Sequence, residues 1–201
     1  MISLKEIIIN KLGIINKYLK KKVKKMSTKD IKERFDDKLE ELKEVLPPLG
    51  RNIGNSCAAQ TLMPIIDVLG IKDLEVFYFN NLAIPFSGFG TYSSEDGWSG
   101  PCGVVSGSMA AIGIIMGGKE ELNPREVPNV YMKAIRFATK FEEKFGSVRC
   151  KDICGFDLAK QDEYEQYKKQ NIWVKKCQHF VLFAVDQVRK LTRTDLKKKW
   201  T

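Results

Sequence analysis

The sequence predicts an all-α protein: a compact helical bundle preceded by a basic amphipathic helical extension. Apolar residues recur three and four positions apart along most of the chain, as they do on one face of a helix. The alternating apolar and polar runs typical of strands are nearly absent. The chain has 201 residues, of which 43% are hydrophobic, and this is enough to bury one main core.

The first segment, residues 1–50, is expected to form the basic extension. Residues 1–25 hold eight lysines and one glutamate, a balance of +7, so the rest of the chain contributes only +2 of the net charge of +9. Its apolar residues fall on one side of a helix and its lysines on the other. A second helix, capped by Ser27 or Thr28, is expected to run to Pro47.

An amphipathic, lysine-rich helix predicts attachment to an acidic partner protein or to an anionic membrane surface through residues 1–25. The alternative is that this helix docks on its own domain or on a second copy of the chain, as part of a homo-oligomer. Nucleic acid is not an expected partner, because the segment lacks arginine and offers only Tyr18 for stacking on bases.

The main domain is placed at residues 51–201, where the composition changes from charged to apolar. Asn55 or Ser56 is expected to cap a helix that ends at Gly70. A short helix over residues 73–80 and a Gly/Ser/aromatic loop over residues 84–100 should follow. The remaining helices are expected at residues 101–116, from Pro128 to Gly146, at 160–169 and at 173–191, before a basic tail.

Five cysteines are spread widely over the main domain, and no cleavable export signal is expected from the first residues. This pattern predicts a cytoplasmic protein, with membrane association through residues 1–25 as a further option, whose thiols bind metal or perform redox chemistry. The single histidine, His179, excludes a Rieske cluster and a histidine-rich zinc site. No C-x-x-C-H motif is present, so covalently attached haem is not expected.

Several cysteines fall at expected helix starts. Cys57 follows a helix cap, Cys102 lies in the first turn of the next long helix, and Cys177 lies near the start of the last one. Cys150 comes just after the helix end at Gly146. Free N–H groups and the positive end of the helix dipole favour thiolates, so separate helix ends could together supply the ligands of one cofactor.

The helix expected at residues 101–116 carries a stripe of small residues, namely Gly103, Ser106, Gly107, Ala110 and Gly113. Each glycine costs roughly 1 kcal/mol relative to alanine in a helix, but it lets another backbone come close. Close approach would bring distant cysteines together. The alternative is a tightly packed buried helix with an incidental cysteine, whereas a membrane span would need about 20 apolar residues.

Four segments, "NSCAAQTL", "CGVVSGSMAAIGIIMGG", "FEEKFGSVRCKDICGFDL" and "KKCQHFV", together resemble the C_GCAxxG_C_C family of proteins described as redox-active. The resemblance covers roughly residues 55–191. It places the four hallmark cysteines of that family on Cys57, Cys102, Cys150 and Cys177. Val104 stands where the family has alanine, and Cys154 lies outside the hallmark set. The family also resembles the cysteine-rich module of split-Soret cytochromes, which implies an iron–sulfur centre, but their haem-bearing part has no counterpart here.

Three functions are compatible with these residues. The first is an iron–sulfur protein in which the hallmark cysteines hold a cluster, most simply a 2Fe–2S cluster, with Gly103 and Gly107 at the cofactor and no haem. It would act in electron transfer or redox sensing with an unidentified redox partner protein. The second is a thiol–disulfide redox protein with Cys102 as the attacking thiolate, and the third is a structural zinc protein with four cysteine ligands. No nucleophile with a general base and no catalytic carboxylate pair is evident, so an electron carrier is favoured over a stand-alone enzyme.

Other residues have two interpretations each. Cys154 is expected to be a small packed hydrophobe rather than a substitute ligand. His179 is expected to face solvent rather than to bond to a cluster sulfur. Four aromatic side chains either shield a cofactor from water or anchor a loop on the core; they are Phe86, Phe89, Tyr92 and Trp98.

Overall fold

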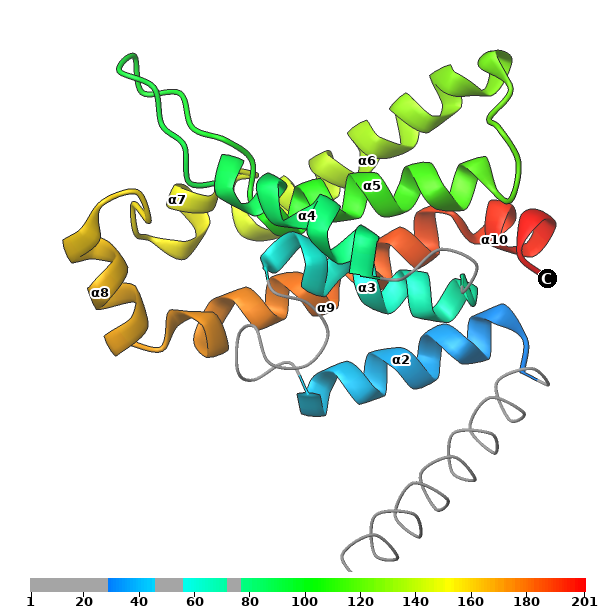
Figure 1. Cartoon of the computed structure of the whole chain (residues 1–201), viewed down its shortest axis with the longest axis horizontal. Helices are drawn as coiled ribbons and strands as arrows, with labels where there is room; N and C mark the ends of the chain where they lie inside the picture. Colours follow the sequence, from blue (N-terminus) through cyan, green and yellow to red (C-terminus); the bar gives the residue numbers. More distant parts are fainter. Residues whose placement is uncertain (1–28, 46–55, 72–76) are drawn as a thin grey trace, which may run out of the picture.

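The computed structural model describes residues 29–45, 56–71 and 77–201, and these residues form helices and no strands (Figure 1). The all-α prediction is therefore confirmed. The long helices are α2 (Ile31–Val45), α3 (Cys57–Leu69), α4 (Phe77–Phe89), α5 (Gly103–Gly117), α6 (Val127–Phe145) and α9 (Gln178–Leu191). The short ones are η1 (Pro124–Glu126), α7 (Cys150–Cys154), α8 (Gln161–Lys169), η2 (Trp173–Cys177) and α10 (Arg193–Lys199). The helix predicted over residues 1–26 lies outside the described residues.

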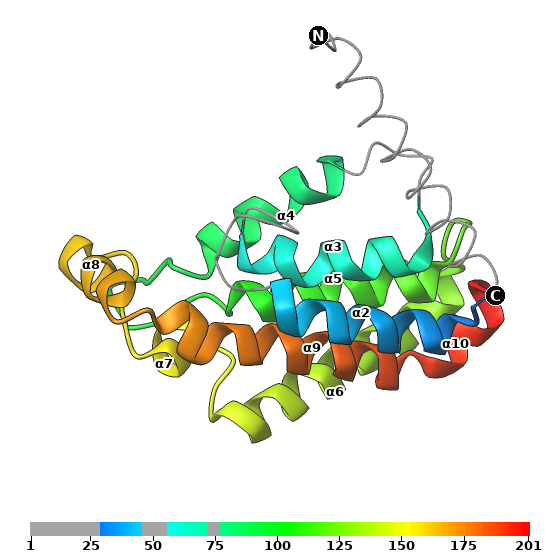
Figure 2. The same ribbon diagram turned by 90° about the horizontal axis from the view of Figure 1, so that it is seen from below.

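Helix α5 lies at the centre of the bundle and packs against α3, α4, α6 and α9. Helix α2 packs against α3 and α9 and runs beside them in the view from below (Figure 2). Its side chains Phe35 and Leu42 are fully buried, so this part of the predicted extension contributes to the same core as the main domain. The core is filled largely by aliphatic and phenylalanine side chains, including Leu62, Ile66, Ile112, Phe137, Phe141 and Val185.

The helix boundaries follow the capping signals of the sequence. Ser56 caps α3, its hydroxyl accepting a hydrogen bond of 3.2 Å from the Ala59 N–H, and Gly70 ends that helix with a φ of 70°. The predicted cap of helix α2 was wrong, because the helix begins at Ile31, three residues after Thr28. Asp30 caps it instead: Asp30 accepts from the Glu33 N–H at 2.8 Å, and Glu33 accepts from the Asp30 N–H at 3.2 Å.

Two further predictions are wrong in extent, and one helix was not predicted. The loop predicted at residues 84–100 begins only after Phe89, because α4 continues through Pro85. The predicted basic tail is largely the helix α10, followed by Trp200, whose indole N–H donates to the Ile115 carbonyl of α5 at 2.9 Å. The segment after Gly146 forms the short helix α7, which the sequence had not indicated.

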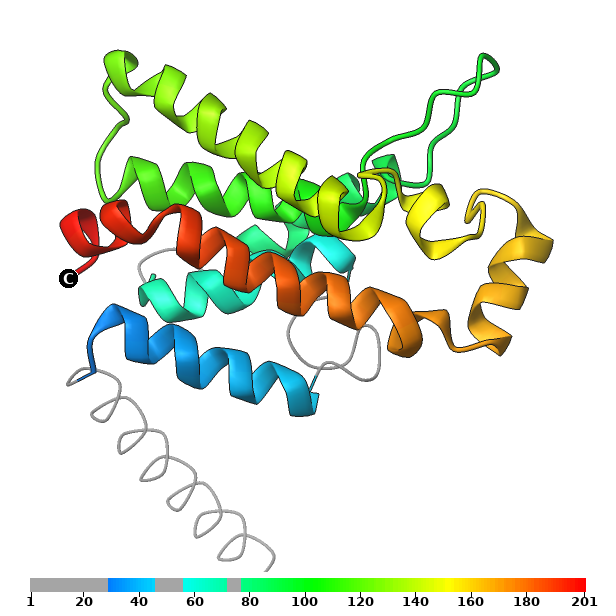
Figure 3. The ribbon, with the colours of Figure 1, turned by 180° about the vertical axis from the view of Figure 1, so that it is seen from behind.

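The long helices α3, α5 and α9 run in the same direction (Figures 1 and 3). Their starts therefore gather at one end of the bundle, where α7 and α8 also lie, and α10 occupies the opposite end. This arrangement places the cysteine-bearing ends of four elements together. No helix in the described part of the chain is long and apolar enough to cross a membrane.

Candidate functional site

Cys57 is the first residue of α3, where backbone N–H groups lack partners inside the helix. One of these groups, the Ala58 N–H, donates to the Ser87 hydroxyl of α4 at 2.9 Å. Ser87 thus ties the start of α3 to α4, and it is a site residue that the sequence had not singled out. The Cys57 side chain is half-buried and packs against the core.

Cys102 is the residue that precedes α5, and its side chain is buried. Its backbone N–H donates to the Val148 carbonyl at 2.7 Å, and an antiparallel bridge joins Pro101 to Arg149. These contacts hold the chain just before Cys150 against the start of α5. Cys102 and Cys150, which are 48 positions apart in the sequence, are brought to the same end of the bundle as a result.

Two glycines of α5 bring α3 onto it, as the small-residue stripe predicts. A Cβ atom added at Gly107 would lie 2.4 Å from the Ala58 carbonyl oxygen, and one at Gly103 would lie 3.2 Å from the Cys57 Cβ. No larger residue fits at this distance, so the two positions set how closely Cys57 approaches Cys102. The stripe prediction is wrong for Gly113, where an added Cβ would meet nothing within 4 Å.

Cys177 is the last residue of η2, a π-helical turn that leads into α9. Single π-turns are rare and are frequent at functional sites, because they change the direction of the side chains that follow. The Cys177 side chain is buried, and its sulfur lies 3.5 Å from the hydroxyl of Tyr167 on α8. Tyr167 is itself buried and packs edge-on against Phe156.

Cys154, expected to be a packed hydrophobe, is buried but also joins the other cysteines. Its thiol donates to the Phe156 carbonyl at 3.2 Å, and its sulfur accepts from the Phe156 N–H at 3.4 Å. Charge on Cys154 also raises the pKa of Cys57 and Cys177. We call the five free cysteines the thiol cluster: Cys57, Cys102, Cys150, Cys154 and Cys177.

The thiol cluster keeps most of its protons. Burial raises the pKa of the Cys57 thiol well above its ordinary value, and charge on Cys102 and Cys177 adds to the effect. Burial also raises the pKa of Cys177 to about 12. Hydrogen bonds to Cys102 and Cys154 raise the pKa of Cys150 far above its usual range.

Two members of the thiol cluster ionise more readily. A hydrogen bond from Cys150 lowers the pKa of Cys102, helped by the N–H groups of Val104 and Val105 at the start of α5. A hydrogen bond from Cys150 likewise lowers the pKa of Cys154 to about 7, with further help from the Phe156 N–H and the Lys176 ammonium.

Comparison with known families decides the relationship of this chain. The family described as "Putative redox-active protein (C_GCAxxG_C_C)" matches residues 55–191, more than half of the chain. The chain belongs to this family. No curated protein and no solved structure shows a significant match.

Membership in the C_GCAxxG_C_C family confirms the resemblance and supports a redox role for the chain. The matched segment spans all five cysteines of the thiol cluster, including Cys154. The signal for Cys154 was its spacing, since residues four apart on a helix share a face. Tyr167 carried no comparable signal, because its contact with Cys177 depends on how α8 packs.

Other expected site residues lie around or away from the thiol cluster. His179 is exposed, as predicted. The rings of Phe89, Tyr92 and Trp98 pack against one another with centroids 5.5–6.4 Å apart. They are about half exposed, so they do not anchor the loop on the core. Among the described residues, no group of three or more His, Cys, Asp or Glu side chains is arranged to hold a metal ion.

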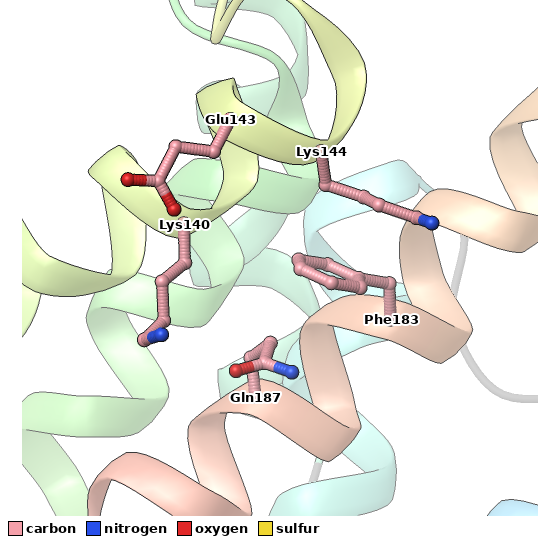
Figure 4. Close-up of a pocket in the computed structure, with 5 residues that line it drawn as sticks. All are labelled: Lys140, Glu143, Lys144, Phe183 and Gln187. Carbon is pink, nitrogen blue, oxygen red and sulfur yellow. The ribbon is translucent and has the colours of Figure 1, made fainter.

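An open groove of about 290 Å³ lies between α6 and α9, and none of its lining residues is a cysteine (Figure 4). Lys140, Glu143 and Lys144 come from α6, and Phe183 and Gln187 come from α9. The groove is separate from the thiol cluster and is not part of the candidate site.

Proposed function

We propose that this protein is an iron–sulfur protein, in which Cys57, Cys102, Cys150 and Cys177 hold a cluster for electron transfer or redox sensing. The observation that supports this most is the convergence of thiols from α3, α5, α7 and η2 at one end of the bundle. When bound, a 2Fe–2S cluster supplies a one-electron couple and takes four thiolate ligands. The donor chemistry fits, since the side chains that converge are soft thiols.

The raised pKa values in the thiol cluster are consistent with cysteines that ionise when a metal cation binds beside them. Burial and mutual repulsion raise the pKa of Cys57 and Cys177, so these thiols stay neutral at neutral pH when no cation is near. Iron binding would displace their protons and compensate the resulting charge.

Residues around the cysteines have roles of their own in this proposal. Gly103 and Gly107 hold α3 against α5, and Ser87 fixes the start of α3 beside Cys57. The Tyr167 hydroxyl would donate to the Cys177 sulfur, which stabilises negative charge on that ligand. An unidentified redox partner protein would exchange electrons with the site, and residues 1–25 would attach the protein to an acidic protein or an anionic membrane surface.

The second candidate function is thiol–disulfide exchange, which the lowered pKa of Cys102 favours. In that reaction the Cys102 thiolate attacks a disulfide of a partner, and the Cys150 thiolate then displaces the partner from the mixed disulfide. The pair becomes a disulfide, loses two protons and two electrons, and leaves the partner as a dithiol. A structural zinc site with four cysteine ligands is the third candidate.

Purification without oxygen, with iron, sulfide and zinc counted per chain, separates the three functions. The proposed function predicts a brown protein with iron and sulfide in equal amounts and a charge-transfer absorption in the visible range. A colourless protein without iron, in which Cys102 reacts rapidly with an alkylating reagent, would contradict it in favour of thiol exchange. Zinc without sulfide would contradict it in favour of the structural site.

A further inference from the structure

Helix α4 buries small residues and exposes large apolar ones. Ala83 is fully buried, and the Ser87 hydroxyl accepts a backbone N–H of α3 at 2.9 Å. Leu82, Phe86 and Phe89 lie at positions i, i+4 and i+7, so they form one stripe along the helix, and they are 38–60% exposed. The large apolar stripe of a surface helix normally faces the core. Its exposure on α4, which packs against α3 and α5 at the outside of the bundle, indicates that another surface covers it (Figure 2).

The stripe continues into the hairpin of residues 90–100, which projects from the bundle at the end where α7 and α8 lie (Figures 1 and 3). The rings of Tyr92 and Trp98 pack against Phe89 with centroids 6.4 and 5.5 Å away. Backbone hydrogen bonds order the hairpin, since the Ser94 N–H donates to the Trp98 carbonyl at 2.8 Å and the Gly100 N–H to the Tyr92 carbonyl at 3.0 Å. Ordered aromatic side chains lose little conformational freedom on binding and are frequent at the centres of protein interfaces. We call these five side chains the α4 face: Leu82, Phe86, Phe89, Tyr92 and Trp98.

The α4 face is large enough to form the apolar centre of a dimer interface. An aromatic side chain offers about 150–250 Å² for burial. The four rings of the α4 face are 38–52% exposed, so together they leave roughly 300–450 Å² to be covered, and Leu82 adds to this area. A standard interface buries about 800 Å² per partner, with an apolar centre and a polar rim. Exposed polar neighbours such as Asn81 would belong to that rim.

The α4 face also lacks charge. From residue 77 to residue 118 the only charged residues are Glu95 and Asp96, which are exposed at the turn of the hairpin. Permanent homodimers use apolar surfaces with few charges at the centre, whereas partners that bind transiently use more polar ones. A membrane is a less suitable occupant, because the projecting turn would bring both carboxylates to anionic headgroups.

We propose that the α4 face is a homodimer interface, in which the α4 helices of two copies of this chain pack against each other. A two-fold interface uses the same patch on both copies, and an uncharged apolar patch is complementary to itself. With the two α4 helices antiparallel, the hairpins lie at opposite ends of the interface, so Glu95 and Asp96 of one copy do not meet those of the other. The inference does not depend on what the thiol cluster binds.

Sedimentation equilibrium of the full-length protein tests the inference, with far-ultraviolet circular dichroism to verify folding. The wild-type protein is expected at twice the mass of one chain. Leu82→Glu and Trp98→Glu each place two carboxylates in the dimer interface and should raise the dimer dissociation constant by at least about 30-fold. Both side chains are about half exposed, so the variant chains should still fold. Ile135→Glu is the matched control, because Ile135 is 56% exposed on α6, outside the α4 face, and it should leave the dissociation constant unchanged.

Quenching of tryptophan fluorescence by acrylamide is the second readout. Trp98 is exposed, whereas Trp173 and Trp200 are buried, so quenching reports on the α4 face. Quenching should increase when the wild-type protein is diluted, and it should be high at every concentration in Leu82→Glu. A wild-type protein that stays monomeric would overturn the inference, also where vesicles of neutral lipid shield Trp98. A dimer that Leu82→Glu and Trp98→Glu leave intact, or that Ile135→Glu weakens equally, would overturn it as well.

Discussion

Replacing Gly107 with alanine tests whether the close contact of α3 and α5 assembles the site. The added Cβ would lie 2.4 Å from the Ala58 carbonyl oxygen, 2.9 Å from its Cα and 3.0 Å from its carbonyl carbon. These are backbone atoms of α3, so no side-chain rotation relieves the contact. Helix α3 must move by about 1 Å to reach the ordinary separation of 3.4 Å.

Gly113→Ala on the same helix is the matched control, because an added Cβ there meets nothing within 4 Å. It should stabilise the protein by about 0.5–1 kcal/mol, since alanine favours the helix over glycine. Gly107→Ala receives the same gain but also an overpacking cost of about 1–3 kcal/mol. The difference between the two variants isolates that cost.

The measurement is thermal unfolding of both variants by circular dichroism. At about 2–4 °C per kcal/mol for a chain of this size, Gly107→Ala should melt roughly 2–12 °C below Gly113→Ala. Iron loading should also fall in Gly107→Ala, because the displaced α3 carries Cys57 next to Ala58. Equal melting temperatures and equal iron content in the two variants would refute the role assigned to this contact.

Three more predictions concern the ligands and the first segment. Tyr167→Phe should lower the reduction potential of the cluster in a redox titration, because hydrogen bonds to ligand sulfur favour the reduced state. Iron per chain should stay constant, and an unchanged potential would contradict the role given to Tyr167. The metal-free protein should lose stability as the pH rises from 9 toward 12, because Cys177 ionises near 9 when unfolded but at about 12 when folded. Thermal unfolding at about pH 8 and about pH 10 measures this, and Cys177→Ala should weaken the dependence. Deleting residues 1–25 should weaken binding to anionic vesicles in a salt-dependent way and leave iron content unchanged; unchanged binding would rule that attachment out.

Local signals were sufficient to predict most of the helices. Ser56 with Gly70, and Gly146 after α6, act through hydrogen bonds and backbone angles that involve a few neighbouring residues. The extension of α4 through Pro85 was missed, because proline disfavours a helix locally and only packing of the whole element overrides that preference. Helix α10 was missed for a similar reason, since the contact of Trp200 with α5 is made across the bundle.

The small-residue stripe was drawn too wide around the helix. At about 100° per residue, Gly107 lies about 40° from Gly103 around α5, whereas Gly113 lies about 120° from Gly107. Only Gly103 and Gly107 meet α3 closely, and an added Cβ at Gly113 would meet nothing within 4 Å. The sequence therefore located the close contact of two helices but overestimated how many small residues take part in it.

The cysteines at predicted helix starts do lie at one end of the bundle, but their position at a helix start does not by itself determine their pKa values. A helix dipole is worth about 0.3–1 kcal/mol, which is less than one pKa unit, whereas burial can shift a pKa by about 3–5 units. Cys102 has its pKa lowered because a hydrogen bond from Cys150 acts together with the helix start, but Cys57, at an equivalent start, has its pKa raised by burial and by its neighbours. The order in which these thiols give up their protons is therefore set by the thiol cluster as a whole. That order depends on the two cysteines of α7, a helix that the sequence had not indicated.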